Sequence, residues 1–398
     1  MKKMGLGQLE ARGRQVLMRV DFNVPLDPDG NITDDTRLRA ALPTIRHLLD
    51  VGASVVLMSH LGRPKGQVVP SMSLKPVAER LAGLLEGPVL FATDTVGDDA
   101  KRLAAALEPG QVLMLENLRF DAAETRNDPQ FAAELATLGD CYVNDAFGAA
   151  HRAHASTVGV GAGFNIRCAG FLMEKELENL GRLMFEPARP FVAVLGGAKI
   201  QGKVEVIDQL LDRVDTLLLG GGMIFNFFRV QGFNVGDSLV DEASLDIVRA
   251  ILDKVTGARA ELILPIDVKI GDSFSNEAAT RDVEVTAIPD HWQGLDIGPR
   301  TIARFEDVIR SARSIFWNGP LGVFEMPTFA LGTEAVARAV AEATDGGALS
   351  VIGGGDSVAA INKTGLAHRI SHISTGGGAS LEFMAGRALP GVLALTDA

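Results

Sequence analysis

The segment Phe171–Phe185, FLMEKELENLGRLMF, separates two halves of the sequence that differ in chemistry. Pro187 and Pro190 follow it and prevent a helix from continuing. We interpret the segment as a helix that connects two domains, although an ordinary helix inside one large domain would show the same pattern. Its apolar residues recur at the spacing of one helical face: Met173, Leu177, Leu180 and Met184.

Length and composition limit the class of protein. A chain of 398 residues, 47% hydrophobic and 22% charged, predicts two or three globular domains. Its net charge of −12 argues against nucleic acid or an anionic membrane as a partner. No apolar run approaches the ~18 residues of a membrane-spanning helix. Cys141 and Cys168 lack metal-ligand spacing, so we expect buried, reduced thiols and a cytoplasmic protein.

The first half alternates between strand-like and helix-like segments. This alternation predicts a mostly parallel sheet with helices on both faces. The expected strands are Gln15–Val20, Ser54–Ser59, Val89–Phe91, Gln111–Leu115 and Cys141–Asn144. The expected helices are Thr36–Asp50, Lys75–Glu86, Asp98–Leu107 and Pro129–Leu138.

Four of these strands are followed by arginine or histidine. Because ligands bind beyond the carboxyl ends of parallel strands, we expect these side chains to share one edge. Guanidinium groups bind phosphate and carboxylate bidentately, so the set predicts a site for a small anion, although a single arginine would be an ordinary surface residue. The motifs are RVDFNVP (19–25), SHLGRP (59–64), ENLRF (116–120) and NDAFGAAHRAH (144–154), with Arg37 near a helix start.

The second half places glycine clusters after its strands. Clusters that end five strands of one sheet indicate backbone left accessible to a nucleotide. An expected helix covers Asp241–Val255, and Asp272–Ala279 is expected to be irregular. The expected strands are Pro190–Leu195, Thr216–Leu219, Glu261–Leu264, Ser314–Trp317, Ala348–Ile352 and His372–Ser374.

The first cluster, GGAKIQGKV (196–204), nearly matches the P-loop pattern. Val204 stands where that pattern needs a hydroxyl for Mg²⁺, which disfavours a Walker-type nucleotidase. Lys199 and Lys203 still offer charge to a phosphate. Asp356 follows glycines near a helix start and is either a Mg²⁺ ligand or a simple N-cap. Glu325 either binds ribose hydroxyls or is a solvated acid.

Taken in order, these motifs resemble those of the phosphoglycerate kinase family almost from end to end. Ala149 and Ser357 stand where many members have threonine, which is a conservative change. The matching strings are RVDFNVP, SHLGRP, ENLRF, FGAAHRAHAS, LGGAKIQGK, GGGM, WNGPLGVFE, GGGDS and STGGGASLE.

The resemblance implies an α/β fold of two doubly wound, mainly parallel-sheet (Rossmann-like) lobes joined by an interdomain helix. The implied parts are a phosphoglycerate-binding lobe (1–170), a hinge helix (171–186), a nucleotide-binding lobe (187–385) and a tail (386–398) that packs back on the first lobe. The implied reaction converts 1,3-bisphosphoglycerate and ADP to 3-phosphoglycerate and ATP with Mg²⁺, after domain closure. We also expect a monomer, with which the acidic composition is compatible, in the cytoplasm that the two cysteines indicate.

The resemblance also implies site residues. The phosphoglycerate would be held by Asp21, Asn23, Arg37, His60, Arg63, Arg119 and Arg152. The nucleotide would be held by Lys199, Lys203, Gly220, Gly221, Gly222, Asn318, Gly322, Glu325, Gly353, Gly354, Gly355, Asp356 and Ser357, with Asp356 on Mg²⁺. The main catalytic groups would be Arg37, Lys199, Gly354 and Gly377.

Two other functions are weighed against this one. A different two-lobed kinase for a small phosphorylated acid would keep the glycine clusters but need other residues at the basic edge. A nucleotide-binding regulator would not need the whole arginine and histidine set.

Overall fold

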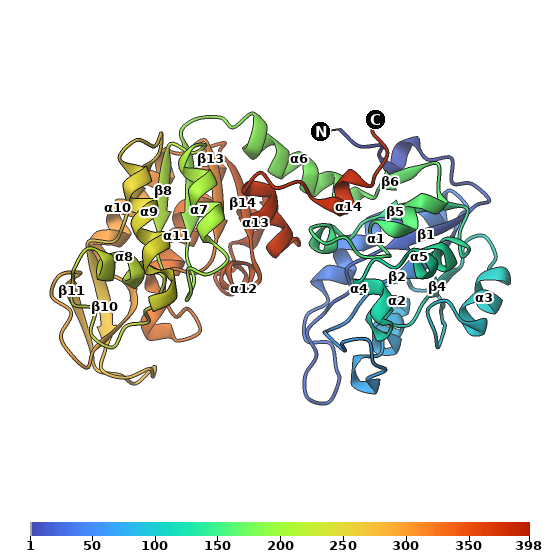
Figure 1. The fold of residues 1–398 in the computed structure, drawn as a ribbon, viewed down its shortest axis with the longest axis horizontal. Helices are drawn as coiled ribbons and strands as arrows, with labels where there is room; N and C mark the ends of the chain where they lie inside the picture. The colour runs from blue at the N-terminus through green and yellow to red at the C-terminus, as the bar shows by residue number, and fades with distance from the viewer. Residues whose placement is uncertain (1) are drawn as a thin grey trace. The chain divides into compact units, whose positions relative to one another are not determined.

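The computed structural model describes residues 2–398, which divide into two compact units (Figure 1). Unit 1 contains the chain up to Glu178 together with Ala388–Ala398, and unit 2 contains Asn179–Arg387. The division falls within α6 (Phe171–Phe185), whose bounds are those expected from the sequence. Within residues 2–398, no helix combines the length and the apolar character that crossing a bilayer requires.

Unit 1 is built on a six-stranded parallel sheet in the order β3-β4-β2-β1-β5-β6. Its strands are β1 (Gln15–Arg19), β2 (Ser54–Met58), β3 (Val89–Phe91), β4 (Val112–Met114), β5 (Cys141–Asn144) and β6 (Arg167–Ala169). Its helices are α1 (Thr36–Asp50), α2 (Lys75–Leu85), α3 (Asp98–Ala105), α4 (Ala122–Thr125), α5 (Pro129–Ala136) and α14 (Pro390–Leu393).

Both faces of this sheet are covered. Val16 and Met18 lie on one face, in a core shared with apolar residues of α1 and α2. Leu17, between them, points to the opposite face and is also buried. Burial on both faces explains the continuous apolar strands of the sequence and confirms the predicted doubly wound layout. Cys141 and Cys168 are buried free thiols, as expected.

Unit 2 has a second six-stranded parallel sheet, in the order β15-β14-β13-β7-β8-β9. Its strands are β7 (Phe191–Leu195), β8 (Thr216–Leu219), β9 (Glu261–Ile263), β13 (Ser314–Asn318), β14 (Leu349–Gly353) and β15 (His372–Ile373). Its helices are α7 (Val204–Leu211), α8 (Ile224–Val230), α9 (Leu245–Val255), α10 (Pro299–Ser311), α11 (Leu331–Asp345), α12 (Gly355–Lys363) and α13 (Gly378–Met384).

A small antiparallel sheet of unit 2 was not predicted from the sequence. It pairs β10 (Asp267–Gly271) with β11 (Thr280–Glu284) and β12 (Gln293–Ile297). The stretch expected to be irregular forms the connection between β10 and β11. Most of β11 is exposed, so it lacks the apolar alternation that identifies a strand, and its pairing with β10 defines it.

The C-terminal segment of the chain completes unit 1. Thr396 accepts a hydrogen bond from the amide of Met4 at 2.8 Å and donates its own amide to the carbonyl of Arg167 at 3.0 Å. The amide of Gly391 donates to the carbonyl of Ala150 at 2.8 Å. The segment therefore bonds to the N-terminal residues and to the sheet-edge strand β6.

Candidate functional site

The four basic motifs of unit 1 lie at one edge of its sheet. They follow β4, β2, β1 and β5, which are consecutive neighbours in a parallel sheet. The carboxyl ends of these strands therefore face the same way, as the sequence predicted.

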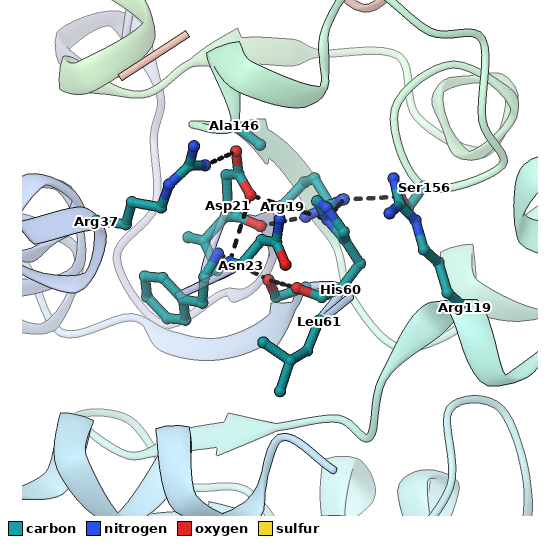
Figure 2. Close-up of polar contacts among 12 residues, drawn as sticks. Arg19, Asp21, Asn23, Arg37, His60, Leu61, Arg119, Ala146 and Ser156 are labelled. Atoms are coloured by element: carbon teal, nitrogen blue, oxygen red, sulfur yellow. Dashed lines mark hydrogen bonds and ion pairs between the residues drawn. The ribbon is translucent and has the colours of Figure 1, made fainter. Parts of the chain in front are cut away.

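Asp21 is central to this group of polar side chains (Figure 2). Its carboxylate pairs with the guanidinium of Arg37, and its Oδ1 lies 3.9 Å from Nδ1 of His60. Burial raises the pKa of Asp21, but the opposing charges, Arg37 foremost, bring the pKa below its ordinary value. Asn23 accepts a hydrogen bond from the amide of Gly62 at 2.8 Å. The structure thus brings together Asp21, Asn23, Arg37 and His60.

The remaining predicted arginines surround this group. Arg119 donates to the carbonyl of Gly62 at 2.8 Å, and burial, together with neighbouring cations, lowers its pKa to about 10, so it is charged at neutral pH. Arg152 is exposed and donates from Nε to Nε2 of His151 at 3.0 Å. Arg63 is exposed and has no polar partner among the described residues. These cations outnumber the single carboxylate of Asp21, which makes this edge suited to an anion.

Sequence reasoning missed the layer beneath these residues. Arg19 is fully buried and contacts His60 and Ser156, while Ser156 contacts the fully buried Glu124. A buried charge must be paired or hydrogen-bonded, and in the sequence nothing distinguishes Glu124 from a surface acid. The available signal was the position of Arg19 directly after the apolar residues Val16–Met18 of β1.

In unit 2, the glycine clusters follow β15, β14, β13, β7 and β8, which are consecutive neighbours in the sheet. Gly221, which follows β8 and Gly220, has φ +70°, and a Cβ there would lie 2.4 Å from the amide nitrogen of Gly197. Gly354 has φ +96° and immediately precedes α12. These glycines let two strand-end loops pack against each other, and the amide of Gly221 donates to the carbonyl of Leu321 at 2.9 Å.

A cavity of about 440 Å³ lies beside these loops. Five predicted nucleotide residues line it: Gly221, Gly222, Gly322, Glu325 and Asp356. Much of the remaining wall was not predicted, and includes Phe225, Leu239, Phe274, Leu295 and Leu321. The lining also contains four acidic residues, Asp237, Asp296, Glu325 and Asp356. Apolar walls joined to bare backbone and acidic side chains can accept a flat apolar group that carries polar substituents.

Lys203 contacts the first glycine loop of unit 2. Its ammonium group donates to the carbonyl of Gly196, and burial lowers its pKa to about 8 despite the opposing charge of Asp356. Lys199 is exposed. Neither lysine lines the cavity, so the structure places them near it without showing a contact to a ligand.

Other predicted residues hold the loops in shape. The side-chain amide of Asn318 donates to the carbonyl of Gly353 at 2.7 Å. The hydroxyl of Ser357, in the first turn of α12, accepts from the amide of Gly319. Gly355 opens α12, and Gly377 directly precedes α13. Asn318 and Ser357 thus have structural partners here, and their contact with a nucleotide stays a prediction.

Asp356 is an exposed carboxylate in the first turn of α12. Among residues 2–398, no group of three or more histidine, cysteine, aspartate or glutamate side chains is arranged to hold a metal ion. One carboxylate is, however, what Mg²⁺ commonly takes from a protein when phosphate oxygens complete its coordination. Asp356 therefore fits a Mg²⁺ ion that arrives with a nucleotide.

Comparison with known proteins agrees with both units. The phosphoglycerate kinase family model matches residues 6–387. The phosphoglycerate kinase of Prosthecochloris aestuarii is 54% identical over 397 residues, and that of Chloroflexus aggregans is 56% identical over 400 residues; each alignment covers 100% of both chains. The structure of phosphoglycerate kinase from Coxiella burnetii superposes with a TM-score of 0.88 at 39% identity and covers 98% of each chain. This chain therefore belongs to the phosphoglycerate kinase family.

Proposed function

We propose that unit 1 of this enzyme binds the acid substrate and that unit 2 binds the nucleotide. The family's reaction transfers a phosphoryl group between 1,3-bisphosphoglycerate and ADP and yields 3-phosphoglycerate and ATP. The observation that carries the proposal is the contrast between a cationic sheet edge in unit 1 and a glycine-bounded, largely apolar cavity in unit 2.

In unit 1, the proposed ligand is 3-phosphoglycerate, which has a carboxylate and a phosphate. Arg63, Arg119 and Arg152 supply guanidinium groups for anionic oxygens, while Asp21 and Asn23 suit the hydroxyl group. Arg37 and His60 complete the set. The exposed guanidinium of Arg63 needs no rearrangement of protein contacts before it binds a ligand.

In unit 2, the proposed ligand is ADP or ATP. The apolar wall of the cavity suits the base, Glu325 suits the ribose hydroxyls, and the glycine amides with Lys199 and Lys203 suit the phosphates. Mg²⁺ bound to Asp356 and to phosphate oxygens would neutralise negative charge on the nucleotide.

The chemistry requires positioning rather than an activated nucleophile. The acceptor in the ATP-consuming direction is a carboxylate, which is already ionised at neutral pH. Catalysis then consists of aligning the reacting oxygens and stabilising the charge on the transferring group. Arg37 and Lys199 are the proposed cationic donors, and the amides near Gly354 and Gly377 are the proposed backbone donors.

Transfer requires that the two ligands meet with water excluded, so the proposed cycle includes domain closure, with α6 as the hinge element. The proposed form of the enzyme is a cytoplasmic monomer. A Leu180→Pro change in α6 should reduce turnover more than it weakens binding of either substrate. Equal losses together with a lower melting temperature would instead indicate unfolding.

The division of substrates is tested by a coupled assay with ATP, Mg²⁺ and 3-phosphoglycerate. Arg63→Ala should raise KM for 3-phosphoglycerate about tenfold and leave KM for ATP unchanged, because the Arg63 side chain has no polar partner within residues 2–398 to lose. Glu325→Gln, also at an exposed residue, should raise KM for ATP alone. A crossed result, in which Arg63→Ala acts on ATP, would refute the assignment.

A further inference from the structure

A chain of buried polar side chains runs beneath the cationic edge of unit 1. It links Glu124 of α4, Ser156, Arg19 of β1 and His60, which follows β2. Figure 2 shows Ser156, Arg19 and His60 of this chain. Glu124, Ser156 and Arg19 are completely buried, and His60 is 5% exposed. Enclosed polar groups of this kind have definite hydrogen-bond partners, so the direction of each bond can be determined.

The bonds at the Glu124 end have a single consistent direction. Nε of Arg19 lies 2.8 Å from Oγ of Ser156, and that Oγ lies 2.7 Å from Oε1 of Glu124. A guanidinium group only donates hydrogen bonds, so the hydroxyl of Ser156 accepts from Arg19. That hydroxyl in turn donates a hydrogen bond to Glu124. Oε2 of Glu124 accepts from the amide of Ser156 at 3.0 Å. Glu124 thus accepts on both oxygens, which is the pattern of a carboxylate.

The same rule fixes the tautomer at the other end. Nη2 of Arg19 lies 2.9 Å from Nδ1 of His60. Because Arg19 must donate, Nδ1 must offer a lone pair, and the ring proton of a neutral imidazole then lies on Nε2. An imidazolium would direct an N–H group at the guanidinium.

Burial and the neighbouring charges together favour the neutral form of the His60 ring. Burial is the largest cause that lowers the pKa of His60 well below its ordinary value, and Arg19, Arg119 and Arg37 act in the same direction. Asp21, whose Oδ1 lies 3.9 Å from Nδ1, opposes them. No described residue bonds to Nε2, and that nitrogen is not among the enclosed unpaired atoms, so its N–H is open to a ligand.

We propose that Glu124, acting through Ser156 and Arg19, holds His60 as a neutral imidazole whose Nε2–H donates a hydrogen bond to an anionic oxygen of the acid substrate. Glu124, Ser156 and Arg19 are positioning residues in this scheme. The proposal rests on the proposed function, since it takes the unit 1 cluster to be the acid site. A neutral donor adds a directed bond where several arginines already supply positive charge.

The tautomer is tested in the intact, ligand-free chain by NMR with ¹⁵N-labelled histidine, with the His60 signals assigned from a His60→Gln variant. Nε2 should appear protonated and Nδ1 unprotonated between about pH 5.5 and 8. A protonated Nδ1, or titration to imidazolium within that range, would overturn the proposal. No substrate is added, so the result is independent of whether unit 1 binds 3-phosphoglycerate.

The effect of Glu124 on His60, transmitted through Ser156 and Arg19, is tested by Glu124→Gln, with Glu134→Gln as its matched control. An amide at position 124 sets an N–H group against a donor of Ser156, so the His60 ring signals should shift and KM for 3-phosphoglycerate should rise severalfold. Glu134 lies on α5 and bonds to Gln130 instead, so its variant should match the wild type in both measurements. Unchanged His60 signals in a folded Glu124→Gln protein would refute the positioning role of Glu124.

The direction of donation is tested by comparing two replacements of His60. The amide nitrogen of Gln can occupy the place of Nε2, whereas that of Asn can occupy the place of Nδ1. His60→Gln should therefore bind 3-phosphoglycerate about tenfold more tightly than His60→Asn in calorimetry. Equal affinities, or tighter binding by His60→Asn, would contradict donation from Nε2.

Discussion

The candidate sites of the two units are made from different parts of the chain. In unit 1, charged side chains contact one another and rest on buried polar groups such as Arg19 and Glu124. In unit 2, bare backbone and apolar side chains form most of the cavity wall, and the ionisable side chains that line it are acids rather than arginines. The first arrangement fixes permanent charges in advance, whereas the second depends on close contacts between loops.

The largest effect is expected from Arg37→Ala in unit 1. Removal of a cation that stabilises the transferring group should lower kcat about a thousandfold. Arg39→Ala is a matched control, because Arg39 lies on the same helix, is exposed and pairs with Asp35 instead. The coupled assay measures both variants. A change confined to KM would place Arg37 in binding rather than in the reaction.

In unit 2, the corresponding change is Gly221→Ala. Its Cβ would collide with the backbone of Gly197 and Pro320, so we expect a loss of about 3 kcal/mol in unfolding free energy together with weaker ADP binding. Gly202→Ala is the control, because Gly202 has φ +80° but, apart from its chain neighbours, no atom of the described residues lies within 4 Å of the added carbon. That control should lose only about 1 kcal/mol. Urea unfolding of both variants separates the cost of the steric collision from the cost of placing alanine at a positive φ. Equal losses of unfolding free energy in the two variants would show that the collision contributes nothing.

The two sites should also differ in proton uptake. At pH 8, Lys203 is partly deprotonated, and a bound phosphate would raise its pKa, so ADP binding should take up about half a proton. Calorimetry in buffers of different ionisation enthalpy measures this uptake. Lys203→Arg, which is always charged, should abolish it. Binding of 3-phosphoglycerate to the arginines of unit 1 should show none, and comparable uptake there would contradict the contrast.

The smallest effect concerns a buried acid of unit 1. Burial raises the pKa of Asp145 to about 6 from 3.8, although the amide of Met173 donates to it at 3.0 Å. Between about pH 4 and 6, the folded protein holds a proton that the unfolded chain has released, so stability falls as pH rises through that range. Asp145→Asn should remove this dependence and add about 1 to 2 kcal/mol at pH 7.5.

Urea unfolding of Asp145→Asn and the wild type at pH 4 and pH 7.5 provides the check. The variant should gain stability relative to the wild type only at the higher pH. An equal difference at both values would mean that the carboxyl group does not titrate as its burial requires.

The sequence predicted the parallel sheets and the basic edge because apolar strands and their polar ends are local patterns. It did not predict β12 or the cavity wall, since residues such as Phe225 and Leu295 look like ordinary core residues until the fold leaves them beside a cavity. It also could not identify Glu124, because only the tertiary structure shows that this acid is enclosed. In a sequence, a charged residue at a strand end is therefore easier to recognise than a cavity whose wall is made by backbone and core side chains.

The return of the C-terminal segment to unit 1 has a consequence for the order of synthesis. The backbone of Thr396 forms hydrogen bonds with Met4 and with Arg167 of β6. Thr396 leaves the ribosome only after all of unit 2 has been synthesised. The first unit to be translated is thus the last to be finished. Until then, its outermost strand lacks these bonds, so nascent chains that stop before residue 388 should be more readily cleaved near β6 than the completed protein.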